Sequence, residues 1–187
     1  MNALVKNSFK IVSLLCLDVA AFYSSLLTAY FSRLLLDILF PGSLPEQLAL
    51  GHFLRVWWLP MTFLTFIAYE RLYVRKLPFW DETRELFKAS SAAAVAILAI
   101  ITLGKLSLDL SRLTVIFLWC SGLILFPLFR LVGKKVLFSA GLWKDNVIII
   151  GAGSAGLQTA KGITADTHLG YHVIGFLDDD EQIGRHV

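Results

Sequence analysis

Charged residues are scarce in this sequence. Asp, Glu, Lys and Arg make up 17% of its 187 residues, whereas a typical soluble domain carries about 25%. This shortage argues against an ordinary soluble globular protein. The formal net charge is only +3, and no basic face with interleaved aromatic residues is visible, so nothing points to a nucleic-acid-binding protein.

Cysteine and histidine are also rare. The two cysteines, Cys16 and Cys120, lie within apolar runs, so the sequence indicates neither a disulfide framework nor a metal-binding knuckle. We expect both to be small buried hydrophobic residues. His168 and His172 have no third ligand nearby in the sequence, and we expect them to be loop or strand-edge residues.

Hydrophobic residues, by contrast, make up 57% of the chain, and its mean hydropathy is +0.70. A helix that crosses about 30 Å of hydrocarbon needs about 20 apolar residues. Four runs approach this length. We therefore predict an α-helical membrane region at 1–140 with four transmembrane helices, at about 11–31, 53–69, 86–103 and 113–129.

Lysines and arginines predict the orientation. They gather before the first apolar run, between the second and third, and after the fourth. The positive-inside rule then places both termini and the segment 70–88 in the cytoplasm. Basic residues that flank the last run are expected to lie against anionic lipid; they are Arg130, Lys134, Lys135 and Lys144.

The segment after Pro78, which can begin a helix, is predicted to be amphipathic and to lie in the membrane interface before the third run. One side would hold Phe79, Trp80, Thr83, Leu86 and Phe87. The other would hold Asp81, Glu82, Arg84, Glu85 and Lys88. This helix is either an anchor for the third run or a platform that gathers lipid head groups or docks the soluble part, and we favour the anchor.

Two residues inside the apolar runs are unusual. Asp18 is a functional candidate, because a carboxylate in hydrocarbon is costly. Hydration, or pairing with an arginine of the loop, would satisfy the same carboxylate, and we favour that structural interpretation. Pro127 removes one backbone hydrogen bond and is predicted to bend the fourth helix.

A change of hydrophobic period marks a second region at 141–187. The β-branched run at 147–150 predicts a strand buried on both faces of a parallel sheet. Gly151, Gly153 and Gly156 follow it in the pattern G-x-G-x-x-G. In a nucleotide-binding turn these glycines allow a tight turn, close approach of a pyrophosphate, and packing of the next helix on the strand.

A helix at about 154–165 and a second strand at about 172–176 should follow the turn. Asp178 then lies where an acidic residue would meet a ribose hydroxyl. This order predicts the start of an α/β Rossmann-like domain (β-α-β), with the three glycines and Asp178 as candidate binding residues for a nucleotide or nucleotide sugar. Alternatively, the turn serves packing alone. One β-α-β unit buries little apolar surface, so we expect the chain to be the N-terminal piece of a longer protein.

Three motifs together resemble a known family. They are Tyr73-x-Arg-Lys-x-Pro-Phe-Trp80, Phe126-Pro-Leu-Phe-Arg130 and Gly170-Tyr-His-Val-Ile-Gly-Phe-Leu-Asp-Asp-Asp180. With four predicted spans before the glycine turn, the chain resembles the N-terminal half of the large bacterial polyprenyl-phosphate sugar-1-phosphate transferases, of the undecaprenyl-phosphate galactose phosphotransferase type. The third motif is less specific, because membrane nucleotide-sugar dehydratases have a similar opening.

The resemblance implies transfer of a sugar-1-phosphate from a UDP-sugar to undecaprenyl phosphate at the cytoplasmic face of the bacterial inner (plasma) membrane, with release of UMP. Such transfer initiates capsule, O-antigen or exopolysaccharide synthesis. In the family this chemistry belongs to a C-terminal domain with a re-entrant helix, an Asp-Glu pair and Mg²⁺. No residue of this chain matches that machinery, so no catalytic residue and no metal ligand is assigned.

The resemblance thus implies an accessory portion for membrane placement, homo-oligomer formation or regulation, with the lipid bilayer as its constant partner and no nucleic acid. Two other functions stay open. One is the front end of a membrane-bound NAD-dependent nucleotide-sugar dehydratase or epimerase. The other is a non-enzymatic membrane scaffold that recruits synthesis partners.

Overall fold

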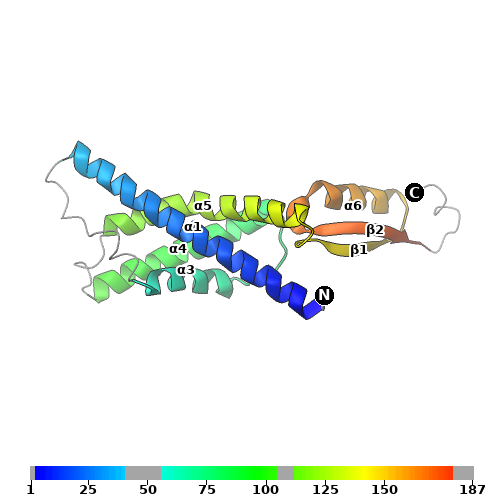
Figure 1. Ribbon diagram of the computed structural model, residues 1–187, viewed down its shortest axis with the longest axis horizontal. Helices are drawn as coiled ribbons and strands as arrows, with labels where there is room; N and C mark the ends of the chain where they lie inside the picture. The colour runs from blue at the N-terminus through cyan, green and yellow to red at the C-terminus, as the bar shows by residue number, and fades with distance from the viewer. Residues whose placement is uncertain (1–2, 41–55, 105–111, 179–187) are drawn as a thin grey trace.

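Four helices pack side by side in a bundle, and a small α/β segment extends from one end of it (Figure 1). The computed structural model describes residues 3–40, 56–104 and 112–178. The bundle helices are α1 (Ala3–Leu39), α3 (Trp58–Tyr69), α4 (Phe79–Leu103) and α5 (Arg112–Ser139). The α/β segment consists of β1 (Asp145–Ile150), α6 (Ser154–Ala165), the 3₁₀ helix η2 (Thr167–Leu169) and β2 (Tyr171–Leu177).

Three helices among the described residues are long and apolar enough to cross a membrane. They are α1, α4 and α5, with 37, 25 and 28 residues, and they confirm three of the four predicted spans. The chain is a membrane protein. The remaining helix, α3, has 12 residues, which is about 18 Å of helix. Residues 53–55 of the predicted second span lie outside the described residues, and this span is not confirmed.

One end of the bundle gathers several parts of the chain. The start of α1, the segment between α3 and α4, and the end of α5 all lie at the end that carries the α/β segment (Figure 1). The prediction that these parts share one side of the membrane agrees with this arrangement. Which compartment that side faces stays a prediction.

Small and aromatic residues form the core of the bundle. The ring of Phe63 lies between those of Phe22 and Phe126, at centroid distances of 5.4 and 5.9 Å. Ala21, Ala29, Ala89 and Ala93 are buried at the same core. Such small side chains let helix backbones approach closely. The resulting van der Waals contacts help helices associate in a membrane.

The expected burial of the cysteines is wrong. Cys16 and Cys120 are exposed on the outer surface of the bundle. On α1 the buried positions include Leu14 and Asp18, and a helix with 3.6 residues per turn places Cys16, halfway between them in sequence, on the opposite side. In a bilayer both thiols therefore face lipid.

The start of α4 also differs from the prediction. Pro78 precedes the helix as expected, but the amphipathic division fails at Glu82, which is only 3% exposed and shares the buried side with Leu86. Trp80 is 78% exposed, on the outside. The first turns of α4 are continuous with the span, and their inner side carries a charge because a partner for it lies inside the bundle.

A β-α-β unit follows α5 in the predicted order, but β1 is not buried on both faces as predicted, because Ile148 and Ile150 are 59% and 86% exposed. Strands β1 and β2 pair in parallel, with Val147 opposite Val173 and Ile150 opposite Leu177, and α6 lies along one side of the pair (Figure 1). A parallel pair needs such a crossover connection. The described residues contain this two-stranded sheet only, so the wider Rossmann-like domain stays a prediction.

A tight turn joins α5 to β1. Gly141 has a φ of +75°, and the backbone N–H of Leu142 donates to the carbonyl of Leu137 at 2.9 Å. This is the pattern in which a glycine ends a helix in the left-handed conformation. The connection is short, so the α/β segment begins directly at the end of the bundle.

Candidate functional site: the glycine turn and the buried ionic junction

The glycine turn between β1 and α6 is built as the sequence predicts at two of its three glycines. Gly151 has a φ of +97°, a conformation that side chains disfavour. A Cβ on Gly156 would collide with the carbonyl oxygen of Gly151. Gly153 is different, because a Cβ there would meet nothing within 4 Å. The backbone conformation therefore requires glycine at Gly151 and local packing requires it at Gly156, whereas the space above Gly153 is open.

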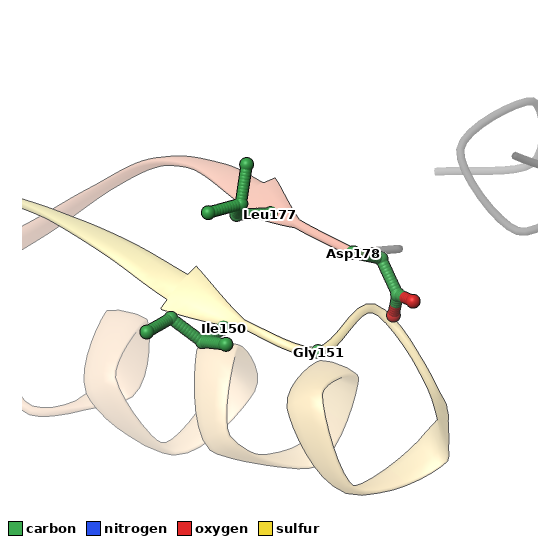
Figure 2. Close-up of a pocket in the computed structure, with 4 residues that line it drawn as sticks. All are labelled: Ile150, Gly151, Leu177 and Asp178. Atoms are coloured by element: carbon green, nitrogen blue, oxygen red, sulfur yellow. The ribbon is translucent and has the colours of Figure 1, made fainter. Parts of the chain in front are cut away.

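Asp178 lies against this turn, at the end of β2. Its Oδ2 accepts a hydrogen bond from the backbone N–H of Ala152 at 2.5 Å. Figure 2 shows the carboxylate directed at the loop that leads from Gly151 into α6. A pocket of about 400 Å³ is lined by Ile150, Gly151, Leu177 and Asp178. The predicted candidate residues thus come together, with the acid bonded to the turn itself.

This geometry bears on what the turn could bind. The first N–H groups of a helix and of the turn before it attract anions, but the Asp178 carboxylate already accepts from one of them. A phosphate at Ala152 would have to displace this carboxylate. A neutral hydroxyl group could instead donate to Asp178. Ligand binding by Gly151, Gly153, Gly156 and Asp178 stays a prediction.

A second group of polar residues, which we call the ionic junction, lies buried where the bundle meets the α/β segment. It consists of Asp18 on α1, Glu82 on α4, Arg130 and Lys134 on α5, and His168 in η2. None of the five is more than 7% exposed, and Asp18 and Arg130 are 0% and 1% exposed. Four separate elements therefore place charged or titratable groups at one point.

Arg130 is the centre of the ionic junction. Its guanidinium donates two hydrogen bonds to Asp18, Nε to Oδ1 at 2.9 Å and Nη2 to Oδ2 at 2.6 Å. Its Nη1 donates to Glu82 Oε1 at 2.7 Å and to the backbone oxygen of Leu72 at 3.3 Å. The favoured structural role of Asp18 is thus what the geometry shows. Its partner, however, is Arg130 of α5 rather than an arginine of the loop.

Lys134 and His168 complete the ionic junction from the other side. Lys134 Nζ donates to both oxygens of Glu82, at 2.8 and 2.7 Å. His168 Nε2 contacts Glu82 Oε2, and it lies 3.2 Å from Lys134 Nζ. The two carboxylates of Asp18 and Glu82 balance the two cations of Arg130 and Lys134, which is the condition under which buried charges are tolerated.

Two sequence expectations are corrected by these contacts. Arg130 and Lys134 were expected to lie against anionic lipid, but they are 1% and 2% exposed because Asp18 and Glu82 pair with them inside the bundle. His168 was expected to be a loop or strand-edge residue, and it is buried in the ionic junction. The available signal was the spacing of Arg130 and Lys134, which places two cations on one side of a helix.

Aromatic rings enclose the ionic junction. The Tyr73 ring lies 5.4 Å from the Arg130 guanidinium carbon, and burial, together with the nearby Asp18 carboxylate, raises the pKa of Tyr73 well above its ordinary value. Trp143 donates from Nε1 to the backbone oxygen of His168 at 3.2 Å. A Cβ on Gly170 would collide with the Trp143 ring. Close packing therefore excludes water from around the charges.

A second polar contact holds β1 to the bundle. Asp145 accepts from Lys10 Nζ of α1 at 2.5 Å and from Lys76 Nζ, and Lys76 also lies over the Tyr171 ring at 4.3 Å. Burial alone would raise the pKa of Asp145, but the hydrogen bonds from the two lysines hold it well below its usual range. The α/β segment is thus fixed to the bundle at two points.

No metal site is found in the part of the chain that the structure describes, since no three His, Cys, Asp or Glu residues there are grouped to hold an ion. In the ionic junction the carboxylates of Asp18 and Glu82 are already taken by Arg130 and Lys134. The resemblance assigns Mg²⁺ to a C-terminal domain and not to these residues, and we assign no step to a metal here.

Comparisons with known proteins agree with the resemblance. Over 110 residues the chain is 34% identical to an undecaprenyl-phosphate galactose phosphotransferase of Salmonella typhimurium and 31% identical to a UDP-galactose-lipid carrier transferase of Erwinia amylovora. It is 32% identical over 107 residues to an uncharacterized sugar transferase of Haemophilus influenzae. The matches cover 59%, 59% and 57% of this chain, but only 23%, 23% and 22% of the respective relatives. No family model matches the chain.

Proposed function

We propose that the chain is the membrane and accessory portion of a transferase that moves a sugar-1-phosphate from a UDP-sugar to undecaprenyl phosphate. The observation that carries this proposal is the 31–34% identity to sugar transferases, one of which has undecaprenyl phosphate in its name. In this role the protein acts at the cytoplasmic face of the inner membrane, at the first step of capsule, O-antigen or exopolysaccharide synthesis.

The geometry supports an accessory role in placing a soluble part at the membrane surface. Undecaprenyl phosphate is dissolved in the bilayer and a UDP-sugar is dissolved in water, so an enzyme that uses both must work at the boundary. The contacts of His168 in the ionic junction and the Asp145 contact fix the α/β segment at the end of the spans. Whatever follows that segment is then held close to the lipid head groups.

The glycine turn supports a second part of the proposal, a nucleotide or UDP-sugar on the α/β segment. The space above Gly153 and the pocket at Asp178 leave room beside the turn. A hydroxyl-rich sugar or ribose suits the Asp178 carboxylate better than a phosphate does. We assign binding to Gly151, Gly153, Gly156 and Asp178, and no catalytic role to them.

The test uses membranes that carry the complete protein of which this chain forms part, supplied with UDP-sugar, undecaprenyl phosphate and Mg²⁺. We expect UMP release that depends on undecaprenyl phosphate. NAD-dependent formation of a keto-sugar instead would identify the dehydratase alternative. If neither UMP nor a keto-sugar forms, the remaining alternative is the non-enzymatic scaffold. Membranes with residues 1–187 alone are expected to release no UMP, because the resemblance places the transfer chemistry outside the motifs found here.

A further inference from the structure

The short turn between α3 and α4 has an inner and an outer side. On the inner side Leu72 is 1% exposed, its carbonyl accepts from Arg130, and the Tyr73 ring covers the Arg130 guanidinium. On the outer side Arg71, Val74 and Arg75 are exposed. The ionic junction therefore holds the backbone of this turn in place from within.

Arg71 has an unusual backbone conformation. Its φ is +56°. No other non-glycine residue in the described parts of the chain has a positive φ. A side chain in this region is disfavoured relative to glycine. Glycine would suit this position after α3 better, as it does at the ends of many helices. The conformation belongs to the end of α3, where the backbone N–H of Leu72 donates to the carbonyl of Ile67 at 3.4 Å, and the Arg71 side chain is exposed.

Two arginines are exposed in this one short turn. The backbone N–H of Arg75 donates to the carbonyl of Arg71 at 3.0 Å, so a single hydrogen-bonded turn joins the two residues. Tyr69 and Val74 beside them are 81% and 70% exposed. Glu70, the acidic residue within 69–75, is half-buried. The outer surface thus combines two cations with an aromatic and an apolar side chain.

We propose that this surface, Tyr69, Arg71, Val74 and Arg75, is a binding site for the phosphate head group of an anionic phospholipid. Charge complementarity and depth select this partner. The surface lies directly after the apolar helix α3 and before α4, whose first turn carries the 78% exposed Trp80, and exposed Trp and Tyr side chains are typical of the head-group level. Tyr69 and Val74 contact the upper part of the acyl chains, and Arg71 and Arg75 donate to the phosphate.

The test measures binding of phosphatidylglycerol, with phosphatidylcholine and inorganic phosphate as the other arms, to the purified full chain by native mass spectrometry. We expect phosphatidylglycerol to bind in preference to phosphatidylcholine, and inorganic phosphate not to compete. Arg71→Gln and Arg75→Gln should each weaken binding about fivefold. Arg71→Lys should retain most of it. Lys161→Gln, on the exposed side of α6, is the matched control and should leave binding unchanged.

The variant Arg71→Gly distinguishes a role of Arg71 in lipid binding from a role in the stability of the fold. Because glycine relieves the positive φ, this variant should melt about 2–4 °C higher in detergent, yet lose phosphatidylglycerol as Arg71→Gln does. A lower melting temperature for Arg71→Gly would show that the guanidinium serves the fold instead. Equal binding of both lipids, displacement by inorganic phosphate, or an equal loss in Lys161→Gln would also overturn the proposal.

Discussion

Gly153 and Gly156 belong to the same glycine turn, but their surroundings constrain them differently. Gly156→Ala places a methyl group against the carbonyl oxygen of Gly151, so the backbone of the turn must move, at about 1–3 kcal/mol. Gly153→Ala meets nothing within 4 Å, and the backbone there has a φ of −68°. It should be neutral, or stabilise slightly by restricting the unfolded chain.

Thermal unfolding of the two alanine variants in the same detergent checks this prediction. A loss in Gly153→Ala as large as that in Gly156→Ala would contradict it. If Gly153→Ala is stable but loses affinity for a nucleotide or UDP-sugar, the open space above Gly153 is where the ligand lies.

Asp18 and Arg130 are expected to depend on each other. Asp18→Asn leaves the Arg130 guanidinium with one carboxylate fewer in a buried site, which should cost about 3–5 kcal/mol. The double variant Asp18→Leu with Arg130→Met should be more stable than either single change, because Glu82 and Lys134 still neutralise each other. Asp37→Asn, at the far end of the same helix, is the matched control.

Unfolding of the wild type, Asp18→Leu, Arg130→Met and the double variant in denaturant gives the coupling energy. Additive losses from the two single changes would show that the pair contributes independently, contrary to the bidentate geometry at 2.9 and 2.6 Å.

Elements that depend on local pattern were predicted well from the sequence. The helices α1, α4 and α5 follow from apolar runs, and β1, α6 and β2 follow from the β-branched run, the glycine turn and their order. The reason is that hydrophobic period and turn residues act over a few residues. The limits of the helices were predicted less well. Thus α5 continues to Ser139, past Pro127, because its last turns bury Arg130 and Lys134.

The ionic junction could not be predicted, because its members are far apart in sequence. Glu82 is 86 residues from His168 and 48 from Arg130. From the sequence alone, a charged residue within a polar stretch is expected to be exposed to solvent, because its partner is not known. Only the three-dimensional arrangement of α1, α4, α5 and η2 shows that Glu82 is at their meeting point.

The attachment of β1 to the bundle should weaken in acid. The lysines hold the pKa of Asp145 below its usual range, so its contribution is complete above the unfolded value of about 3.9 and is lost as the pH falls toward the folded value. The melting temperature of the wild type minus that of Asp145→Asn should be constant above about pH 5 and shrink below about pH 4.

The measurement is a pair of pH titrations of thermal unfolding. The difference should also fall with added salt, because the Asp145 side chain is 34% exposed and its ion pairs are screened. A difference that persists unchanged at pH 3 would show that Asp145 acts through its shape and not through its charge.

At the scale of the whole molecule, the bundle has two distinct ends, and labelling can assign them to compartments. In a background without Cys16 and Cys120, Ser139→Cys, exposed at the end of α5 beside the α/β segment, should react only after the cell is permeabilised. Leu103→Cys, 84% exposed at the far end of α4, should react in intact cells with an impermeant maleimide. The opposite result would reverse the orientation predicted from the basic residues.

The ionic junction also imposes an order on biosynthesis. Asp18 and Glu82 are made before their cationic partners, which both belong to α5, and Asp18 precedes Arg130 by 112 residues. At about 5–20 residues per second the ribosome needs about 6 to 22 s to reach Arg130. Asp18 waits for Arg130 throughout this interval, whereas Glu82, 48 residues before Arg130, waits for about 2 to 10 s. The bundle can therefore close only when its last helix leaves the translocon, and the α/β segment, docked through His168, must follow it.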